Sequence, residues 1–394
     1  MSKYSNKQNR GMDSENPYDD IACSVSEFQS IPIDVSLDEK VGISEDTRKS
    51  IFRWGGQFPP ELAAFIIAKH AVRGSVIVDP FCGSGTVLFE SVRLGLTCFG
   101  SDINPAAVGL SKTAEFSNIP NKSRESLLEN AYNIFQKALN SGISPESNSK
   151  LTHFDYENIK KSIANISPDS EVFNIIFNVL MRLSISKEKG TVPGLVNAFN
   201  IHKKIINSLP YSKNKCDVKI SDAGSLPLKP KSADLVLTSP PYPGVFDYYK
   251  NYKWVMHFLG WNISEIARKE IGHGRGSGNI KSWLIKYSYD MHNALCEIHR
   301  ILKNSGRLIL VVDSNTDIGK SKFDTSALLY LISTLNCGFK LVERQQRHFT
   351  GRNGNIITED ILHLLPINTN TNLNDQRIRK FVEYLYAETN KNAK

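Results

Sequence analysis

A short glycine turn, Asp79-Pro-Phe-Cys-Gly-Ser-Gly-Thr86, separates an apolar segment from a helical one. The segment before it, Ser75–Asp79, is apolar and bounded by glycine and proline, which is typical of a buried parallel strand. The residues after it, Thr86–Leu94, have helical periodicity, and Thr97–Asp102 predicts a second strand ending in an acid. Strand, glycine turn, helix and strand form one βαβ unit, so we expect a parallel sheet.

The pattern of alternating strands and helices resumes later in the chain. Further strands are predicted at residues 216–222, 233–238 and 307–312, with helices at 61–71, 287–303 and 325–335. The last two strands, 339–347 and 360–365, follow each other without a helix, which favours an antiparallel edge. The predicted fold class is therefore α/β, with a Rossmann-like, doubly wound sheet of seven strands.

The predicted sheet is interrupted and flanked by other segments. Residues 1–45 are polar and weakly periodic, which predicts a poorly ordered N-terminal arm. We expect residues 46–116 and 216–366 to form one domain, built around the predicted sheet. Between them, residues 117–215 are rich in Asn, Ser and Lys and predict a mostly helical insertion. Residues 367–394 predict a helical tail.

The amino-acid composition limits the classes of protein to which the chain can belong. No apolar run approaches the length of a membrane span, about 18–20 residues, and the N-terminus does not resemble a secretory signal, so we expect a cytoplasmic protein without a membrane partner. The six cysteines form no CxxC pair, which predicts reduced thiols and no metal site. The net charge of +8 arises mainly in residues 117–215 and 243–310, each with a surplus of five basic residues. This pattern favours a polyanionic partner.

The glycine turn is suited to binding a ligand through its backbone. Two glycines at a strand-to-helix turn allow close approach and present helix N-terminal N–H groups. The turn is not a P-loop, and Leu88 stands where a GxGxxG fingerprint needs its third glycine. Asp102, at the end of the second strand, is placed to accept hydrogen bonds from ribose hydroxyls. The alternative is that Asp102 only caps the helix after Asn104-Pro105.

A second motif, Thr238-Ser-Pro-Pro-Tyr242, follows another predicted strand. Its prolines hold the chain extended and place a hydroxyl, a carbonyl and an aromatic ring side by side. The Ser239 hydroxyl and the Pro240 carbonyl would accept the two hydrogens of an exocyclic amine, while Tyr242 stacks on the ring that bears it. The alternative is an ordinary proline-rich loop after a core strand.

Together, DPFCGSGT and TSPPY resemble the amino-methyltransferases, which use S-adenosylmethionine to methylate exocyclic amines of nucleic-acid bases. Ser-Pro-Pro-Tyr is similar to the cytosine-N4 branch of the DNA enzymes. The segment Arg53–Leu62 resembles the element that precedes the glycine turn in that family. The resemblance covers roughly residues 50–116 and 216–366, and it implies the family's seven-stranded methyltransferase sheet.

The resemblance implies roles for residues in both motifs. S-adenosylmethionine would be bound by residues around the glycine turn and the neighbouring strand ends: Phe58, Pro59, Asp79, Phe81, Gly83, Gly85, Thr86, Asp102 and Asp222. The target base would be held by the catalytic residues Ser239, Pro240, Pro241 and Tyr242. The implied substrate is double-stranded DNA, from which the base must be flipped out because its amine lies on the pairing edge.

Two basic segments are candidates for the element that recognises the target DNA sequence. Residues 243–286 leave the TSPPY motif directly, and their candidate DNA contacts are Lys250, Lys253 and Arg275. Alternatively, the aromatic residues of this segment pack a helix onto the sheet. The insertion 117–215 is large enough to be a recognition module, a lid or a dimer contact. Arg347 lies in a third candidate contact loop or in an ordinary solvated turn.

The sequence predicts a site-specific cytosine-N4 DNA methyltransferase, and the family resemblance suggests a restriction–modification system with a cognate endonuclease. Cytosine-C5 methylation is excluded because it needs a cysteine nucleophile, usually in a Pro-Cys pair, and no Pro-Cys occurs. The alternatives are adenine-N6 methylation of DNA, guanine-N2 methylation of RNA, and an inactive DNA-binding relative. The oligomeric state does not follow from the sequence.

Overall fold

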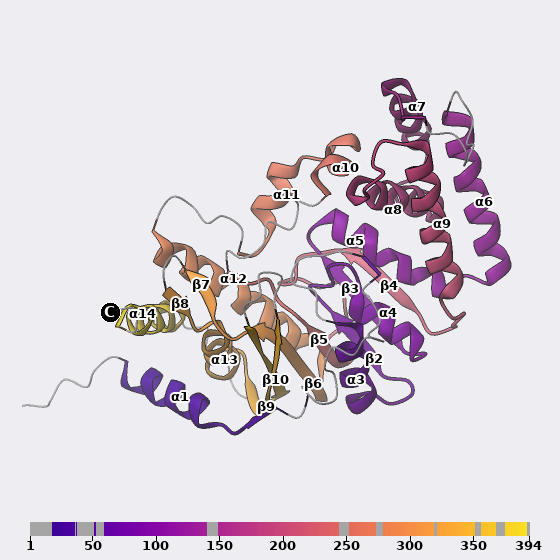
Figure 1. Ribbon diagram of the computed structural model, residues 1–394. Helices are drawn as coiled ribbons and strands as arrows, with labels where there is room; N and C mark the ends of the chain where they lie inside the picture. Colours follow the sequence, from indigo (N-terminus) through magenta and orange to yellow (C-terminus); the bar gives the residue numbers. More distant parts are fainter. Residues whose placement is uncertain are drawn as a thin grey trace, which may run out of the picture.

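The computed structural model describes residues 18–35, 37, 51–52, 59–139, 149–243, 252–272, 279–318, 321–350, 356–367 and 375–391 (Figure 1). Its centre is an eight-stranded sheet with the order β1-β9-β10-β6-β5-β2-β3-β4. The strands are β1 Ile33–Asp34, β2 Val76–Asp79, β3 Thr97–Asp102, β4 Cys216–Ile220, β5 Ala233–Thr238, β6 Leu302–Asp313, β9 Phe339–Thr350 and β10 Ile356–Pro366.

Among the described strands of this eight-stranded sheet, β10 alone runs against its neighbours. It pairs antiparallel with both β6 and β9, while β4, β3, β2, β5 and β6 are joined by parallel ladders. The predicted α/β fold with an antiparallel edge is therefore confirmed. The strand missing from the prediction is β1, which adds to β9 in parallel. A separate two-stranded hairpin, β7 Thr316–Ile318 and β8 Ser321–Phe323, follows β6.

Helices cover both faces of the sheet, and the side chains of its strands alternate between two apolar cores. Ile77 and Leu235 contribute to one core, and the next residues, Val78 and Val236, contribute to the other. The first core is covered by α3 Pro60–His70, α4 Thr86–Arg93 and α5 Pro105–Ser111. The second is covered by α12 Ile280–Ile301, α13 Thr325–Leu335, α14 Asp375–Lys391 and α1 Asp19–Ser30.

Part of the predicted N-terminal arm is ordered. Residues 19–30 form α1, and Ile21, Val25 and Phe28 on one face of this helix are buried against the second core. The prediction of a poorly ordered arm is wrong for residues 19–34. The i, i+4, i+7 spacing of these three apolar residues carried the signal for the helix.

The helical insertion lies beyond the β4 edge of the sheet (Figure 1). Its elements are η1 Lys112–Asn118, α6 Asn121–Ala138, α7 His153–Ala164, α8 Glu171–Ile185 and α9 Val192–Ser208. Arg124 of α6 is fully buried and donates to the carbonyl oxygens of Ile206 and Leu209 at 3.0 and 2.6 Å. Arg124 thus joins the start of α6 to the end of α9.

Two short helices, α10 Lys253–Phe258 and α11 Ile263–Lys269, link the insertion to α12 (Figure 1). The Trp254 ring lies 5.4 Å from the rings of Tyr156, in α7, and Phe258. This aromatic residue of the candidate DNA segment therefore packs α10 against the insertion. Among the residues that the structure describes, every helix is too short or too polar to cross a lipid bilayer.

Candidate active site at the carboxyl ends of the sheet

The glycine turn between β2 and α4 needs glycine at two positions. Gly83 and Gly85 have φ angles of 50° and 90°, in the left-handed region. A Cβ atom on Gly85 would lie only 2.9 Å from Cβ of Ser111. The turn is attached to β3 because the Cys82 N–H donates to the carbonyl oxygen of Ser101 at 2.9 Å. Thr86 then begins α4, as predicted.

Two carboxylates, Asp79 and Asp102, hold this turn from adjacent strands. Oδ2 of Asp102 accepts from the Gly83 N–H at 3.1 Å, and its Oδ1 accepts from the Asn104 N–H at 2.9 Å. Oδ1 of Asp79 accepts from the Phe81 N–H at 3.1 Å. Parallel pairing of β2 with β3 brings the two acids to the same edge of the sheet.

The two sequence motifs meet through a single short hydrogen bond. The Thr238 hydroxyl, at the end of β5, donates to Oδ1 of Asp79 at 2.6 Å. Ser239 is the next residue in the chain. The strand ends that carry the two motifs therefore lie side by side, because β2 pairs with β5, although about 160 residues separate the motifs in the sequence.

The TSPPY loop is fixed by hydrogen bonds from several elements. Oγ of Ser239 lies 3.2 Å from the Tyr242 hydroxyl, which donates to Oε1 of Glu359 at 3.4 Å. The hydroxyl of Tyr287, in α12, donates to the Pro241 carbonyl oxygen at 3.1 Å. Tyr242 is only 7% exposed. A base can stack on its ring only if the side chains that cover it move.

A buried ion pair supports this loop. The Arg347 Nη2 lies 2.6 Å from Oε2 of Glu359, and both side chains are nearly buried. Arg347 therefore does not lie in a solvated contact loop. Glu359 was missed in the sequence because its partners are distant in the chain. The signal was its position opposite Arg347 in the β9–β10 ladder, where opposite charges stabilise the pair.

The loop after β4 completes this edge of the sheet. The Ser221 N–H donates to the carbonyl oxygen of Asp102 at 3.1 Å, which places the next residue, Asp222, beyond the β3 strand end. Asp222 is exposed, and its Oδ1 accepts from the Gly224 N–H at 2.8 Å. Its side chain lines a groove of about 440 Å³ between this loop and α12.

Comparison with known proteins places the chain in a family. A family model of DNA methylases matches residues 3–113. A second model, of D12 class N6 adenine-specific DNA methyltransferases, matches residues 62–258, which is half of the chain. The chain belongs to the DNA methyltransferase family. The family predicted from the two motifs is thereby confirmed at this level.

Two relatives match the chain over shorter segments. The Type II methyltransferase M.MjaII of Methanocaldococcus jannaschii is 38% identical over 55 residues, which is 14% of this chain and 10% of the relative. The Type II methyltransferase M.MvaI of Kocuria varians is 32% identical over 104 residues, 25% of this chain and 22% of the relative. The chain thus spans less than a quarter of either relative's length.

Among solved structures, a SAM-dependent methyltransferase from Methanosarcina mazei is similar to this chain with a TM-score of 0.38 and 13% identity. The match covers 77% of this chain and 97% of that one.

S-adenosylmethionine is the cofactor of this chain, as predicted, and the charges at the strand ends fit it. Burial raises the pKa of Asp79 to about 7, hydrogen bonds from Thr238 and Phe81 oppose this rise, and the nearby Asp102 adds to it. Burial likewise raises the pKa of Asp102 to about 6, against hydrogen bonds from the Asn104 and Gly83 N–H groups. S-adenosylmethionine carries sulfonium and ammonium cations, which would favour the ionised forms of both acids.

Only some of the remaining predicted site residues belong to the part of the chain that the structure describes. Pro59 is half-buried directly before α3, and Lys253 is exposed at the start of α10. Phe58, Lys250 and Arg275 lie outside the described residues.

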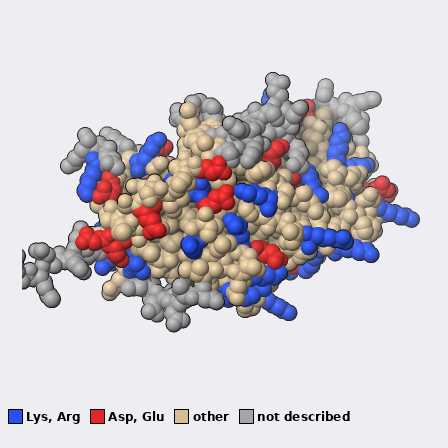
Figure 2. Space-filling view, turned by 90° about the horizontal axis from the view of Figure 1, so that it is seen from below, with Lys and Arg blue, Asp and Glu red and all other residues tan. Residues whose placement is uncertain are grey.

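Only some of the basic side chains of the insertion lie at the surface, where DNA could contact them. Arg124 is buried, and Nη2 of Arg182 donates to the carbonyl oxygen of Ile51 at 2.9 Å while its guanidinium lies over the Phe52 ring. Other basic side chains reach the surface. On the face seen from below, Lys and Arg side chains gather along the right-hand edge, the side on which the insertion lies (Figure 2).

Proposed function

We propose that this chain is a site-specific DNA methyltransferase that methylates the N4 amine of cytosine. The observation that supports the proposal is the 2.6 Å hydrogen bond from Thr238 to Asp79, which joins the residue before Ser239 to the strand end before the glycine turn. A serine at this position, followed by Pro-Pro-Tyr, resembles the cytosine-N4 branch of the family. The relatives that carry the name Type II methyltransferase support a place in a restriction–modification system with a cognate endonuclease.

In this proposal, the protein holds two reactants in line. S-adenosylmethionine supplies an electrophilic methyl group. Asp79 and Asp102 hold the cofactor end of the site, and the Ser239 hydroxyl and Pro240 carbonyl accept the two amine hydrogens. These hydrogen bonds would withdraw the nitrogen lone pair from conjugation with the ring. The amine could then attack the methyl carbon while the methyl–sulfur bond breaks and leaves a neutral thioether, and the methylated amine would lose one proton to water. Direct transfer forms no covalent enzyme intermediate, and catalysis rests on positioning and polarisation.

Adenine-N6 methylation is the second candidate. It is favoured by the D12 class family model, which is described as N6 adenine-specific and matches residues 62–258. The same pair of acceptors serves an adenine amine, because both targets are exocyclic amines on a pairing edge.

One experiment separates the two candidates. The chain is expressed in a host without DNA methylation, and the host's genomic DNA is sequenced by a method that distinguishes N4-methylcytosine from N6-methyladenine. We expect N4-methylcytosine at one recurring sequence. N6-methyladenine would support the second candidate. If neither base appears while the purified protein binds S-adenosylmethionine, the chain is not a DNA methyltransferase for these amines. A Ser239→Ala strain is the matched control.

A further inference from the structure

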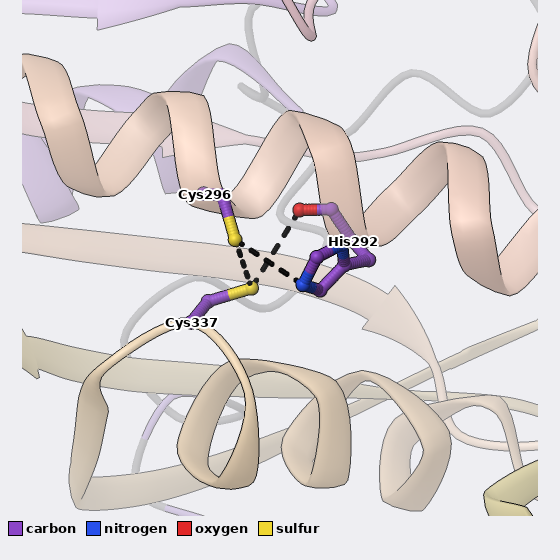
Figure 3. A group of neighbouring side chains, drawn as sticks. All are labelled: His292, Cys296 and Cys337. Carbon is purple, nitrogen blue, oxygen red and sulfur yellow. Dashed lines mark hydrogen bonds between the residues drawn. The ribbon is translucent and has the colours of Figure 1, made fainter. Parts of the chain in front are cut away.

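A cluster of metal-ligating side chains lies outside the proposed active site. His292 and Cys296, both in α12, and Cys337, directly after α13, place their ligand atoms within 4.8 Å of one another. Figure 3 shows the three side chains converging from the two elements. Cys296 Sγ lies 2.9 Å from Cys337 Sγ and 3.4 Å from His292 Nε2. Methyl transfer as derived above uses none of these residues.

The backbone fixes two of the three donors. His292 and Cys296 are four residues apart in one helix, so they share a face. Cys337 is held at the end of α13, because its N–H donates to the Ile332 carbonyl oxygen at 3.1 Å. His292 and Cys337 are 2% and 1% exposed. The three residues form a His-x₃-Cys pair and a distant cysteine. The absence of CxxC pairs, from which the sequence predicted no metal site, does not apply to this spacing.

We propose that His292, Cys296 and Cys337 form a binding site for a thiophilic d¹⁰ metal ion, with Zn²⁺ as the reference ion. In a tetrahedral site with bonds of about 2.3 Å to sulfur and 2.0–2.1 Å to nitrogen, neighbouring sulfur and nitrogen ligands lie about 3.6 Å apart. The observed 3.4 Å between Cys296 and His292 is close to this value. Two sulfurs in such a site lie roughly 3.8 Å apart, so the thiols must separate by about 0.9 Å.

Cys296 can make that adjustment because it is half-buried and lines the 440 Å³ groove that also contains Asp222. The groove gives an ion a path to the site and leaves room for water as a fourth ligand. Its basic side chains do not oppose a cation strongly, since each is paired with a carboxylate. The pairs are Lys269–Glu265, Lys286–Asp290 and Arg300–Glu297.

The His292 imidazole distinguishes a metal site from a pair of cysteines that forms a disulfide. A disulfide between Cys296 and Cys337 would use the two sulfurs alone, whereas a metal site also uses the buried ring nitrogen that faces them. Metal binding would release the thiol protons, because the thiolate is the ligand.

The test is a Zn²⁺ titration of the phosphine-reduced full chain by calorimetry, with Co²⁺ absorption as a second readout. We expect one Zn²⁺ per chain and a Co²⁺ spectrum with thiolate charge-transfer bands. Cys296→Ala should weaken Zn²⁺ binding by ~10²-fold or more, since loss of a ligand exceeds the 10–100-fold cost of losing an outer partner. Cys296→His should retain binding, because it keeps a ligand at this position.

Cys23→Ala is the matched control, since Cys23 is an exposed thiol in α1. It should bind Zn²⁺ as tightly as the original chain. Equal affinity in Cys296→Ala, or no saturation near one equivalent, would overturn the proposal. It would also be overturned if the isolated protein carried a Cys296–Cys337 disulfide and took up no Zn²⁺ after reduction. Circular dichroism of each variant verifies that it is folded.

Discussion

The strand ends and the helical insertion position their polar side chains in different ways. At the strand ends, Asp79, Asp102 and Thr238 each belong to a short motif or end a strand, and the parallel β3–β2–β5 pairing brings them together. In the insertion, Arg124 is held by carbonyl groups of α9 that lie more than 80 residues away. The first arrangement follows from local sequence and topology, and the second from packing between distant segments.

The charged side chains of the two regions therefore differ in what they can bind. Asp79 and Asp102 are both buried carboxyl groups, and the charge of Asp102 adds to the rise in the pKa of Asp79. A cationic ligand would therefore stabilise their ionised forms. The Arg124 guanidinium is instead satisfied by the protein's own carbonyl groups, so it adds to the net charge without offering a contact to DNA. A basic surplus along a segment therefore overstates its capacity to bind a polyanion.

The largest effect is expected from Ser239→Ala. Removing the hydroxyl deletes a preorganised acceptor for the target amine, so methyl transfer should fall by ~10²-fold or more. The affinity for S-adenosylmethionine, measured by calorimetry, should stay nearly unchanged because Asp79 and the glycine turn are intact. Ser208→Ala, at an exposed position at the end of α9, is the control. Normal turnover in Ser239→Ala would remove this residue from the mechanism.

Arg124→Ala should destabilise the insertion without acting on the chemistry. It leaves buried carbonyl groups without a donor, and we expect the free energy of unfolding to fall by about 2 kcal/mol in a denaturant titration. Lys122→Ala, at an exposed position in the same helix, should change it by less than about 0.5 kcal/mol. If Arg124→Ala weakened DNA binding at unchanged stability, our assignment of Arg124 to the fold would be wrong.

The sequence predicted the catalytic fold better than it predicted the surroundings of the site. The strands β3 and β5 have the predicted bounds, because apolar runs between glycine or proline residues are local signals. The insertion was predicted only as mostly helical, without bounds for its helices, although a capping box between Thr152 and Asp155 marks the start of α7. Glu359 and the Cys296–Cys337 contact depend on partners that only the tertiary fold brings together.

The raised pKa values at the strand ends predict a pH-dependent affinity for the cofactor. With a pKa of about 7, the ionised fraction of Asp79 falls from about nine-tenths at pH 8 to about one-tenth at pH 6. If the cationic cofactor binds the ionised form, its affinity should fall roughly tenfold over this range. Calorimetry at several pH values measures the change, and Asp79→Asn should show a much flatter profile.

Stability of the cofactor-free protein should change in the opposite direction. Burial raises the pKa of Asp79 above its ordinary value of 3.8, so the folded state holds a proton that the unfolded state releases. The stabilisation from this group is complete below about pH 4 and is lost as the pH rises through 7. Weaker cofactor binding at pH 6 together with equal or greater stability would therefore exclude acid unfolding as the cause. A fall in both quantities would contradict the role of Asp79.

The smallest expected effect comes from single lysines, and it tests which region contacts DNA. Lys253 is exposed at the start of α10, which follows the TSPPY loop, and Lys203 is exposed in α9 of the insertion. Lys253→Gln should weaken binding to duplex DNA a few-fold and reduce the slope of log affinity against log salt by about one, as expected for one lost phosphate contact. Fluorescence anisotropy at several salt concentrations measures both quantities. Lys203→Gln should leave the slope unchanged if the segment that follows the TSPPY loop, and not the insertion, contacts the DNA. If the two variants gave the opposite result, the insertion would be the DNA-reading element, and its buried arginines would serve to hold a recognition module in shape.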